Sequence, residues 1–192
     1  MILLRVLLIL FITFIISSCS LKQIDDVGEC NFPDNPDQAS PMWLCGEDIV
    51  GSAIYVVGAS SNKGAKLSKR TEALNNATLT LKQQILVSLE SNFDNVVKRS
   101  TYLKKEAVSN IYIKFQEYLN NHELVRVTKY KEAISSKGIL YVAIGYDKKI
   151  YAEVIKNELY KVYQNNSAEL QGVISYKSFL QFSKDLYKDI GK

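Results

Sequence analysis

The sequence is poor in the residues on which most enzyme and metal sites depend. Its 192 residues include a single histidine, His122, and three cysteines that never stand in a Cys-x-x-Cys pair. Zinc sites need several such ligands at set spacings, so this composition gives no metal site. No serine stands in a Gly-x-Ser-x-Gly pentapeptide, which excludes the nucleophile pattern of α/β-hydrolases. We therefore expect a protein that is not an enzyme and that holds neither a metal nor another cofactor.

Long apolar runs are also absent. The longest stretch, Val6 to Ile16 after Arg5, is shorter than the roughly 20 residues that a membrane-spanning helix needs. A short apolar core followed by small residues is typical of a secretory signal instead. We expect residues 1–18 to be a signal peptide.

The end of this stretch indicates how the mature chain begins. Ile16, Ser17, Ser18 and Cys19 resemble a bacterial lipobox, in which cleavage makes the cysteine the first residue and lipids are attached to it. The several acyl chains of a lipoprotein hold it firmly on a membrane. Ser20 stands where an aspartate would retain such proteins at the inner membrane, so the outer membrane is expected. The alternative is an ordinary signal peptide with an incidental cysteine.

Proline is scarce, and its distribution divides the rest of the chain. All three prolines, Pro33, Pro36 and Pro41, lie in the polar segment NFPDNPDQASP. Turn-rich polar sequence without periodicity is typical of a linker, so we expect a lipidated N-terminus and flexible tether over residues 19–40. Residues 41–192 then form a single domain, whose size suits one hydrophobic core.

Two further cysteines, Cys30 and Cys45, flank the proline-rich segment. In an oxidising compartment, two cysteines left after lipidation indicate a disulfide. Pairing within one chain, pairing between two chains and a pair of buried free thiols are all open from the sequence.

Charge of one sign does not accumulate in the chain. The net charge is +4, and the lysines are spread along the sequence, which is typical of a solvated surface rather than a nucleic-acid interface. We expect no nucleic-acid partner. Tyrosine–lysine pairs such as Tyr160-Lys161 and Tyr176-Lys177 predict half-buried rings beside solvated lysines, with an adhesive surface as the alternative.

Glycine is missing between Gly64 and Gly138, and this gap contains the strongest helical pattern. Apolar residues recur at steps of three and four over residues 67–99 and at steps of four over residues 103–119. These patterns predict two helices, with a bend between Ser91 and Ser100 where asparagine and aspartate weaken the helix.

Shorter patterns surround these helices. Residues 53–58 predict a strand, and residues 124–134 and 138–146 predict a β-hairpin, because their periodicity is two. Residues 150–162 and 170–190 are again helical in pattern. The order β-α-α-β-β-α-α predicts an α+β fold in which an antiparallel sheet packs on helices.

The predicted strands are apolar on both faces. In the hairpin, Leu140, Val142 and Ile144 alternate with Tyr141 and Ala143. A sheet covered by a helix on one face needs a second cover for the other. Coverage by the C-terminal helices and coverage by a neighbouring subunit are both consistent with this pattern.

The segment from Gly58 to Lys66 lies between a predicted strand and a predicted helix, as a phosphate-binding loop does. The spacing between Gly58 and Gly64 is one residue too long for that loop, and Ala65-Lys66 stands in place of Lys-Ser or Lys-Thr. We expect a capped turn without a nucleotide. His122, at the end of a predicted helix, is expected to be a surface or capping residue.

A set of residues from Pro41 onward resembles a known family. Pro41 and Trp43 precede the strand Tyr55-Val56-Val57-Gly58, and a helix with spaced alanines follows, including Ala73 and Ala77. This pattern is similar to that of the small bacterial lipoproteins typified by the conserved membrane-associated lipoprotein antigen of Helicobacter, to which the flagellar lipoprotein FlgP and the secreted Tip-alpha protein are related. The resemblance covers residues 41–99; Cys45 and residues 68–70 depart from the pattern.

The resemblance implies a curved three-stranded antiparallel sheet around a long helix, in a domain that self-associates. Small residues one turn apart allow the helix to approach the strand, and Gly58 is expected to permit a chain reversal. The motif is structural and brings no catalytic residue; it consists of Pro41, Trp43, Tyr55, Val57, Gly58, Ala73 and Ala77.

These observations together predict a homo-oligomeric lipoprotein, held on the outer membrane through its N-terminal lipid. Its expected role is that of a structural or assembly component of the cell envelope, with envelope or flagellar proteins as partners. The alternative is a surface-exposed lipoprotein, an adhesin or virulence antigen, that binds host or envelope molecules.

Overall fold

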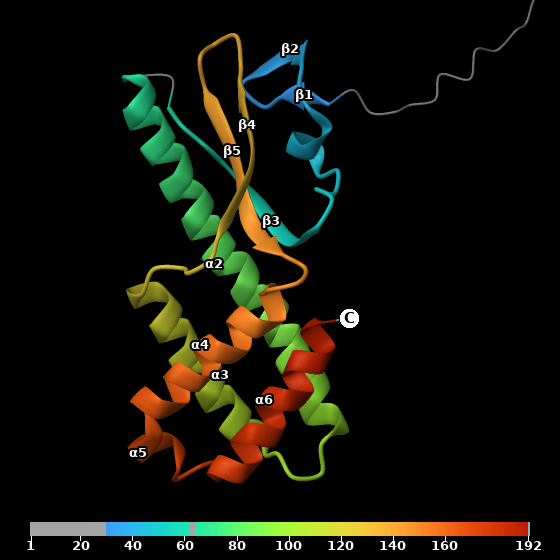
Figure 1. Cartoon of the computed structure of the whole chain (residues 1–192), viewed down its shortest axis with the longest axis vertical. Helices are drawn as coiled ribbons and strands as arrows, with labels where there is room; N and C mark the ends of the chain where they lie inside the picture. Colours follow the sequence, from blue (N-terminus) through green and yellow to red (C-terminus); the bar gives the residue numbers. More distant parts are fainter. Residues whose placement is uncertain (1–29, 62–63, 192) are drawn as a thin grey trace, which may run out of the picture.

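The computed structural model describes residues 30–61 and 64–191 (Figure 1). The expected signal peptide, residues 1–18, and the expected lipidation site, Cys19, lie outside the described residues. Every buried apolar side chain of the described part lies between Cys30 and Leu186. A chain beginning at Ser20 therefore keeps all the described packing contacts.

The longest element is helix α2, Lys66–Arg99. Its buried stripe repeats at three- and four-residue steps, because neighbouring turns of a helix present the same face at that spacing. The break between the two predicted helices begins at Ser100, at the end of the expected range from Ser91 to Ser100, because the helix continues to Arg99. Burial of Phe93 and Val96 holds the last turns in the core despite the weak local propensity. The buried residues of α2 are Ala73, Ala77, Leu81, Ile85, Leu86, Leu89, Phe93 and Val96.

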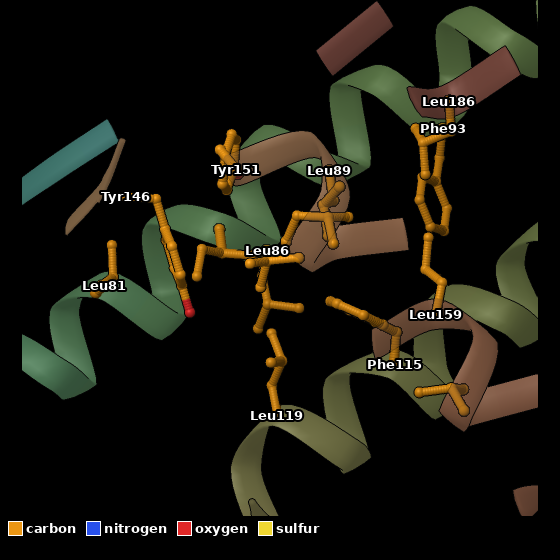
Figure 2. Close-up of a cluster of buried hydrophobic side chains, with 14 of the residues drawn as sticks. Leu81, Leu86, Leu89, Phe93, Phe115, Leu119, Tyr146, Tyr151, Leu159 and Leu186 are labelled. Atoms are coloured by element: carbon orange, nitrogen blue, oxygen red, sulfur yellow. The ribbon is translucent and has the colours of Figure 1, made fainter. Parts of the chain in front are cut away.

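Four further helices pack beside the C-terminal half of α2. They are α3 (Lys105–Asn121), α4 (Tyr151–Asn165), the short α5 (Ser167–Leu170) and α6 (Tyr176–Ile190). Of these, α3 and α6 make the main contacts with α2. Figure 2 shows the core between them, where Phe93 of α2, Phe115 of α3, Leu159 of α4 and Leu186 of α6 point toward one another. The predicted start of the last helix at residue 170 is early, because the Ser175 side chain accepts a hydrogen bond from the Ser178 N–H and caps α6 there.

The main sheet has three antiparallel strands in the order β3-β5-β4. They are β3 (Ser52–Ala59), β4 (Thr128–Ile134) and β5 (Leu140–Asp147). The central strand β5 is buried from Leu140 to Tyr146. One of its faces, with Val142 and Ile144, packs into the same core cluster as α2. The predicted α+β fold, with a three-stranded antiparallel sheet on a long helix, is confirmed.

The expectation of a free tether up to residue 40 is wrong for its described part. Strands β1 (Asn31–Phe32) and β2 (Asn35–Ala39) form a two-stranded sheet, and the 3-10 helix η2 (Met42–Cys45) follows. The Cys30 and Cys45 sulfurs form a disulfide within the chain, with their Cα atoms 5.7 Å apart. Local sequence made this segment look like a linker, but long-range contacts order it.

The second face of the sheet is covered by this N-terminal segment. Figure 1 shows α2 on one side of the sheet and residues 30–50 on the other. Phe32 and Ile49 are buried, and the Phe32 ring lies 5.6 Å from the ring of Tyr141. The cover is thus neither the C-terminal helices nor a neighbouring subunit, the two possibilities that the sequence suggested. An apolar second face consequently gives no argument for oligomerisation.

Candidate functional site

The motif residues of β3 and α2 form a close crossing of strand and helix. A Cβ atom on Gly58 would lie 2.1 Å from the backbone oxygen of Ala73 and 2.7 Å from the Cβ of Ala77. Only glycine fits at this distance, and the small side chains of the two alanines let the helix backbone approach the strand closely. Gly58 lies inside β3, so the expected chain reversal there is wrong; the glycine serves close packing instead.

The remaining motif residues join β3 to the segment before it. The Tyr55 hydroxyl donates to the Trp43 carbonyl at 3.1 Å and to the Glu47 carbonyl at 2.7 Å. Burial, together with the carboxylates of Asp48 and Glu47, raises the pKa of Tyr55. Pro41 precedes η2, whereas Val57 is half-buried on the sheet. These side chains are structural supports, and none of them lines the groove described below.

Asp34 fastens the N-terminal segment to the β4–β5 turn. Its carboxylate accepts hydrogen bonds of 2.6 Å from the hydroxyls of Ser135 and Tyr141, and the Lys137 ammonium donates to its carbonyl at 2.6 Å. Although burial opposes the change, these hydrogen bonds lower the pKa of Asp34. Burial and the Asp34 carboxylate raise the pKa of Tyr141 to about 12. These contacts fasten the N-terminal segment to the turn that closes the hairpin.

A groove lies between the start of α2 and the end of β4. It has a volume of about 840 Å³, within the range of roughly 300–1,000 Å³ that is usual for small-molecule sites. Leu140 and Ala133 belong to the sheet wall, and Leu67 to the helix wall. We call this site the α2–β4 groove; its lining residues are Gly64, Lys66, Leu67, Lys69, Arg70, Glu132, Ala133, Ile134, Gly138 and Leu140.

The groove exists because α2 extends beyond the core. Burial along α2 begins only at Ala73, so no residue from 66 to 72 is buried. The contact at Gly58 fixes the helix against the sheet, and the first two turns of α2 project past that contact. Leu67 on this projection is 76% exposed, and Ile134 on the facing strand is 57% exposed. Two large apolar side chains thus line a groove that no other described segment fills.

The polar lining of the groove is mainly cationic. Arg70 donates two hydrogen bonds to the Glu132 carboxylate, at 3.0 and 2.8 Å, and the Lys69 ammonium donates to the Gly138 carbonyl at 2.7 Å. The guanidinium of Arg70 lowers the pKa of Glu132, and Lys129 contributes in the same direction. Lys66, Lys69 and Arg70 against Glu132 give the lining a net charge of +2.

The helix itself adds to this positive potential. The N-terminal end of α2 has no acidic residue in its first turn and no side-chain cap. Helices usually carry acids at this end, because the macrodipole is positive there. The first turns of α2 instead carry three cations, Lys66, Lys69 and Arg70.

The other residues singled out from the sequence do not meet in one place. His122 ends α3, where its ring stacks on Tyr118 at 4.0 Å and its Nδ1 lies 2.9 Å from the Tyr118 carbonyl. Tyr160 and Tyr176 share a hydrogen bond between their hydroxyls on α4 and α6. Tyr130, on β4, is half-buried. The pairs that contain Tyr160 and Tyr176 thus meet on α4 and α6, whereas Tyr130, which precedes Lys131, lies on the sheet.

Residues 30–61 and 64–191 contain neither a group of metal-ligating side chains nor a membrane-spanning helix. No three side chains of histidine, cysteine, aspartate or glutamate in these ranges are placed to hold a metal ion. None of the helices in the same ranges has the length and apolar character needed to cross a membrane.

Comparison with known proteins gives no assignment. No family model matches the chain, and no curated protein matches it.

The α2–β4 groove was not predicted from the sequence. It arises from the angle between helix and sheet, which no local pattern reveals. Two signals were nevertheless present: Leu67 opens a helix whose buried stripe starts only at Ala73, and three cations occupy the first five helical residues, where acids are usual.

Proposed function

We propose that this protein is a non-enzymatic lipoprotein of the outer membrane that acts as a self-associating structural component of the cell envelope. The observation that carries the proposal is the disulfide between Cys30 and Cys45 inside the folded domain. Disulfides persist in oxidising compartments, outside the cytoplasm. The lipobox-like sequence that ends at Cys19 supplies an anchor there.

The short distance in sequence between anchor and domain supports this arrangement. A chain spans at most about 3.6 Å per residue, so the stretch from Cys19 to Cys30 reaches about 40 Å at full extension. A domain held in this way stays beside the membrane. A domain that cannot diffuse away from the membrane suits a scaffold role.

The charged side chains of the groove are paired with groups of the protein, which supports a non-catalytic role. Arg70 and Glu132 pair with each other across the groove, and Lys69 spans it to the Gly138 carbonyl. A general base must reach the proton that it takes from a substrate, and the Glu132 carboxylate is instead engaged by Arg70 and Lys129. These side chains instead connect helix to hairpin.

Self-association is best supported by the outer edge of β3. No strand of the described residues pairs with this edge, and the strand contains neither charge nor proline from Ser52 to Ala59. The opposite edge strand, β4, carries Lys129, Lys131 and Glu132, which discourage pairing. We propose that two β3 edges pair antiparallel, an arrangement in which the same surface serves both copies.

Light scattering of a soluble form, residues 20–192, tests self-association. Oligomers are expected, and Ala53→Lys should shift them toward monomer, because Ala53 is exposed on β3 and a lysine charges the edge. Val50→Lys is the matched control, since Val50 is 99% exposed just before the strand. A wild-type form that stays monomeric at high concentration would contradict the proposed assembly.

The anchor has a separate test. Mass spectrometry of the native protein should find residues 1–18 removed and Cys19 acylated. Cys19→Ser should release the protein from the membrane fraction without changing the thermal unfolding of the domain, because Cys19 precedes every described contact. A native protein that retains Met1 and a free Cys19 thiol would overturn the proposal.

A flagellar role is supported by the resemblance of residues 41–99 to the family that includes FlgP. A deletion strain that grows normally but does not swim would support it. Normal swimming would shift the assignment to a general envelope role.

A second candidate function is that of a surface-exposed lipoprotein that binds host or envelope molecules. The α2–β4 groove favours it, because an open site with apolar and charged walls suits a ligand. Protease treatment of intact cells separates the two functions: cleavage of the domain indicates surface display, and protection indicates a periplasmic scaffold.

A further inference from the structure

We infer that the α2–β4 groove is a binding site for a single-chain anionic amphiphile, a long-chain fatty acid. The inference rests on the shape, lining and charge of the groove and does not depend on lipidation of Cys19 or on self-association.

The apolar part of the groove suits a hydrocarbon chain. Leu67 on α2 and Ile134 on β4 are 76% and 57% exposed, and Leu140 and Ala133 continue the apolar surface between them. Burying one such leucine or isoleucine stabilises a complex by about 1.5–3 kcal/mol, so two of them supply a substantial part of micromolar binding. An acyl chain lying along the groove covers both side chains.

The charged part suits a carboxylate head. The lining has a net charge of +2, and the N-terminal end of a 34-residue helix adds the positive end of its dipole. The three cations lie within the first five residues of α2, Lys66 to Arg70. Glu132 is already engaged by Arg70 and Lys129, so it repels an incoming anion less than an unpaired carboxylate would.

A neutral lipid or a peptide strand fits these observations less well. A neutral lipid brings no negative charge to Lys66 or to the positive end of the helix, whereas Arg70 and Lys69 already have partners in the hairpin. A peptide added to the free edge of β4 would meet Lys129, Lys131 and Glu132, which protect that edge. The groove does not need the edge, because its walls are side chains of α2 and of the β4–β5 hairpin.

Isothermal titration of residues 20–192 with oleate, below its micelle concentration, tests the inference. We expect saturable binding of one oleate per chain in the absence of vesicles. Monoolein, which has the same acyl chain and no charge, should bind at least about tenfold more weakly, because one lost charge-assisted hydrogen bond corresponds to that factor.

Matched variants locate the site. Leu67→Asp should weaken oleate binding about tenfold or more, the loss expected from removing one buried leucine contact. Leu79→Asp is the control, because Leu79 is 61% exposed on the same helix but lies outside the groove lining. Lys66→Glu should weaken oleate binding and leave monoolein binding unchanged. Its control is Lys177→Glu, which places the same change in the first turn of α6.

Each opposite outcome overturns the inference. Absence of oleate binding, or equal binding by wild type and Leu67→Asp, would remove the site. Equal affinity for oleate and monoolein would show that the groove does not recognise an anionic head group. Binding to phosphatidylglycerol vesicles without binding to free oleate would show a membrane-docking surface instead of a fatty-acid site.

Discussion

Gly58 of β3 lies so close to Ala73 of α2 that an added Cβ would sit 2.1 Å from the Ala73 carbonyl oxygen. This contact fixes the point at which the helix crosses the sheet. The C-terminal part of α2 enters the core from there, and its N-terminal part projects to form one wall of the groove. One glycine therefore positions both the core and the candidate site.

Substitution of this glycine should be costly. Gly58→Ala forces the strand and helix apart, and overpacking of this kind costs about 1–3 kcal/mol or more. Urea unfolding followed by circular dichroism measures the loss. Ala53→Val on the same strand is the control, because Ala53 is exposed and its unfolding midpoint should stay near that of the wild type. A wild-type midpoint for Gly58→Ala would show that the crossing is looser than described.

Reduction of the disulfide should destabilise the domain. The bond between Cys30 and Cys45 closes a loop with a sequence separation of 15, for which the chain-entropy model gives about 3 kcal/mol. A thermal melt with and without dithiothreitol measures this, and the double variant Cys30→Ser, Cys45→Ser should lose the sensitivity to reductant. An unchanged melt on reduction, with reduction verified by thiol titration, would contradict the expectation.

Two tyrosines on neighbouring helices should respond differently to loss of their hydroxyls. Tyr118 donates a 2.6 Å hydrogen bond to Glu158, which is only 7% exposed, so Tyr118→Phe should cost about 2 kcal/mol. The buried Tyr163 hydroxyl has no hydrogen-bond partner among the described residues, so Tyr163→Phe should be neutral or slightly stabilising. Chemical denaturation of both variants checks the contrast, and an equal loss in both would contradict it.

Alkaline pH should weaken the attachment of the N-terminal segment. Burial, together with the hydrogen bond to Asp34, raises the pKa of Tyr141 to about 12 from the ordinary 10.0. Because the folded-state value is the higher one, this contribution to stability is complete below pH 10 and is lost as the pH rises toward 12. Urea midpoints measured across this window should fall for the wild type and fall less for Tyr141→Phe. If the urea midpoints of the wild type and of Tyr141→Phe fell equally with pH, the loss of stability at alkaline pH would come from groups other than Tyr141.

The sequence allowed the regular elements to be predicted, because their packing leaves a period in the residues that pack. The apolar repeat that begins at Leu67 identified α2, and the alternation from Leu140 to Tyr146 identified β5. Local propensity was a poorer guide. It predicted a bend from Ser91 to Ser100, whereas burial of Phe93 and Val96 keeps the helix intact up to the last residue of that range.

The N-terminal segment and the groove could not be predicted, because neither depends on a local pattern. Asp34 is ordered by Ser135 and Tyr141, about a hundred positions away in sequence. The groove depends on where α2 crosses the sheet and on what does not fill the space beside it. Of the candidate site, the sequence indicated the small residues of the crossing but not the cationic, apolar hollow that the crossing creates.

The disulfide also has a mechanical consequence. Any pull on the chain before Cys30 passes directly across the sulfur bridge to Cys45, so the backbone from Asn31 to Leu44 lies outside the path of tension. The Phe32 ring and the Asp34 carboxylate can then stay docked on the sheet while the domain is tugged from its N-terminal side. The disulfide therefore carries the force past the short hairpin β1–β2, so the hairpin stays on the sheet while the chain is under tension.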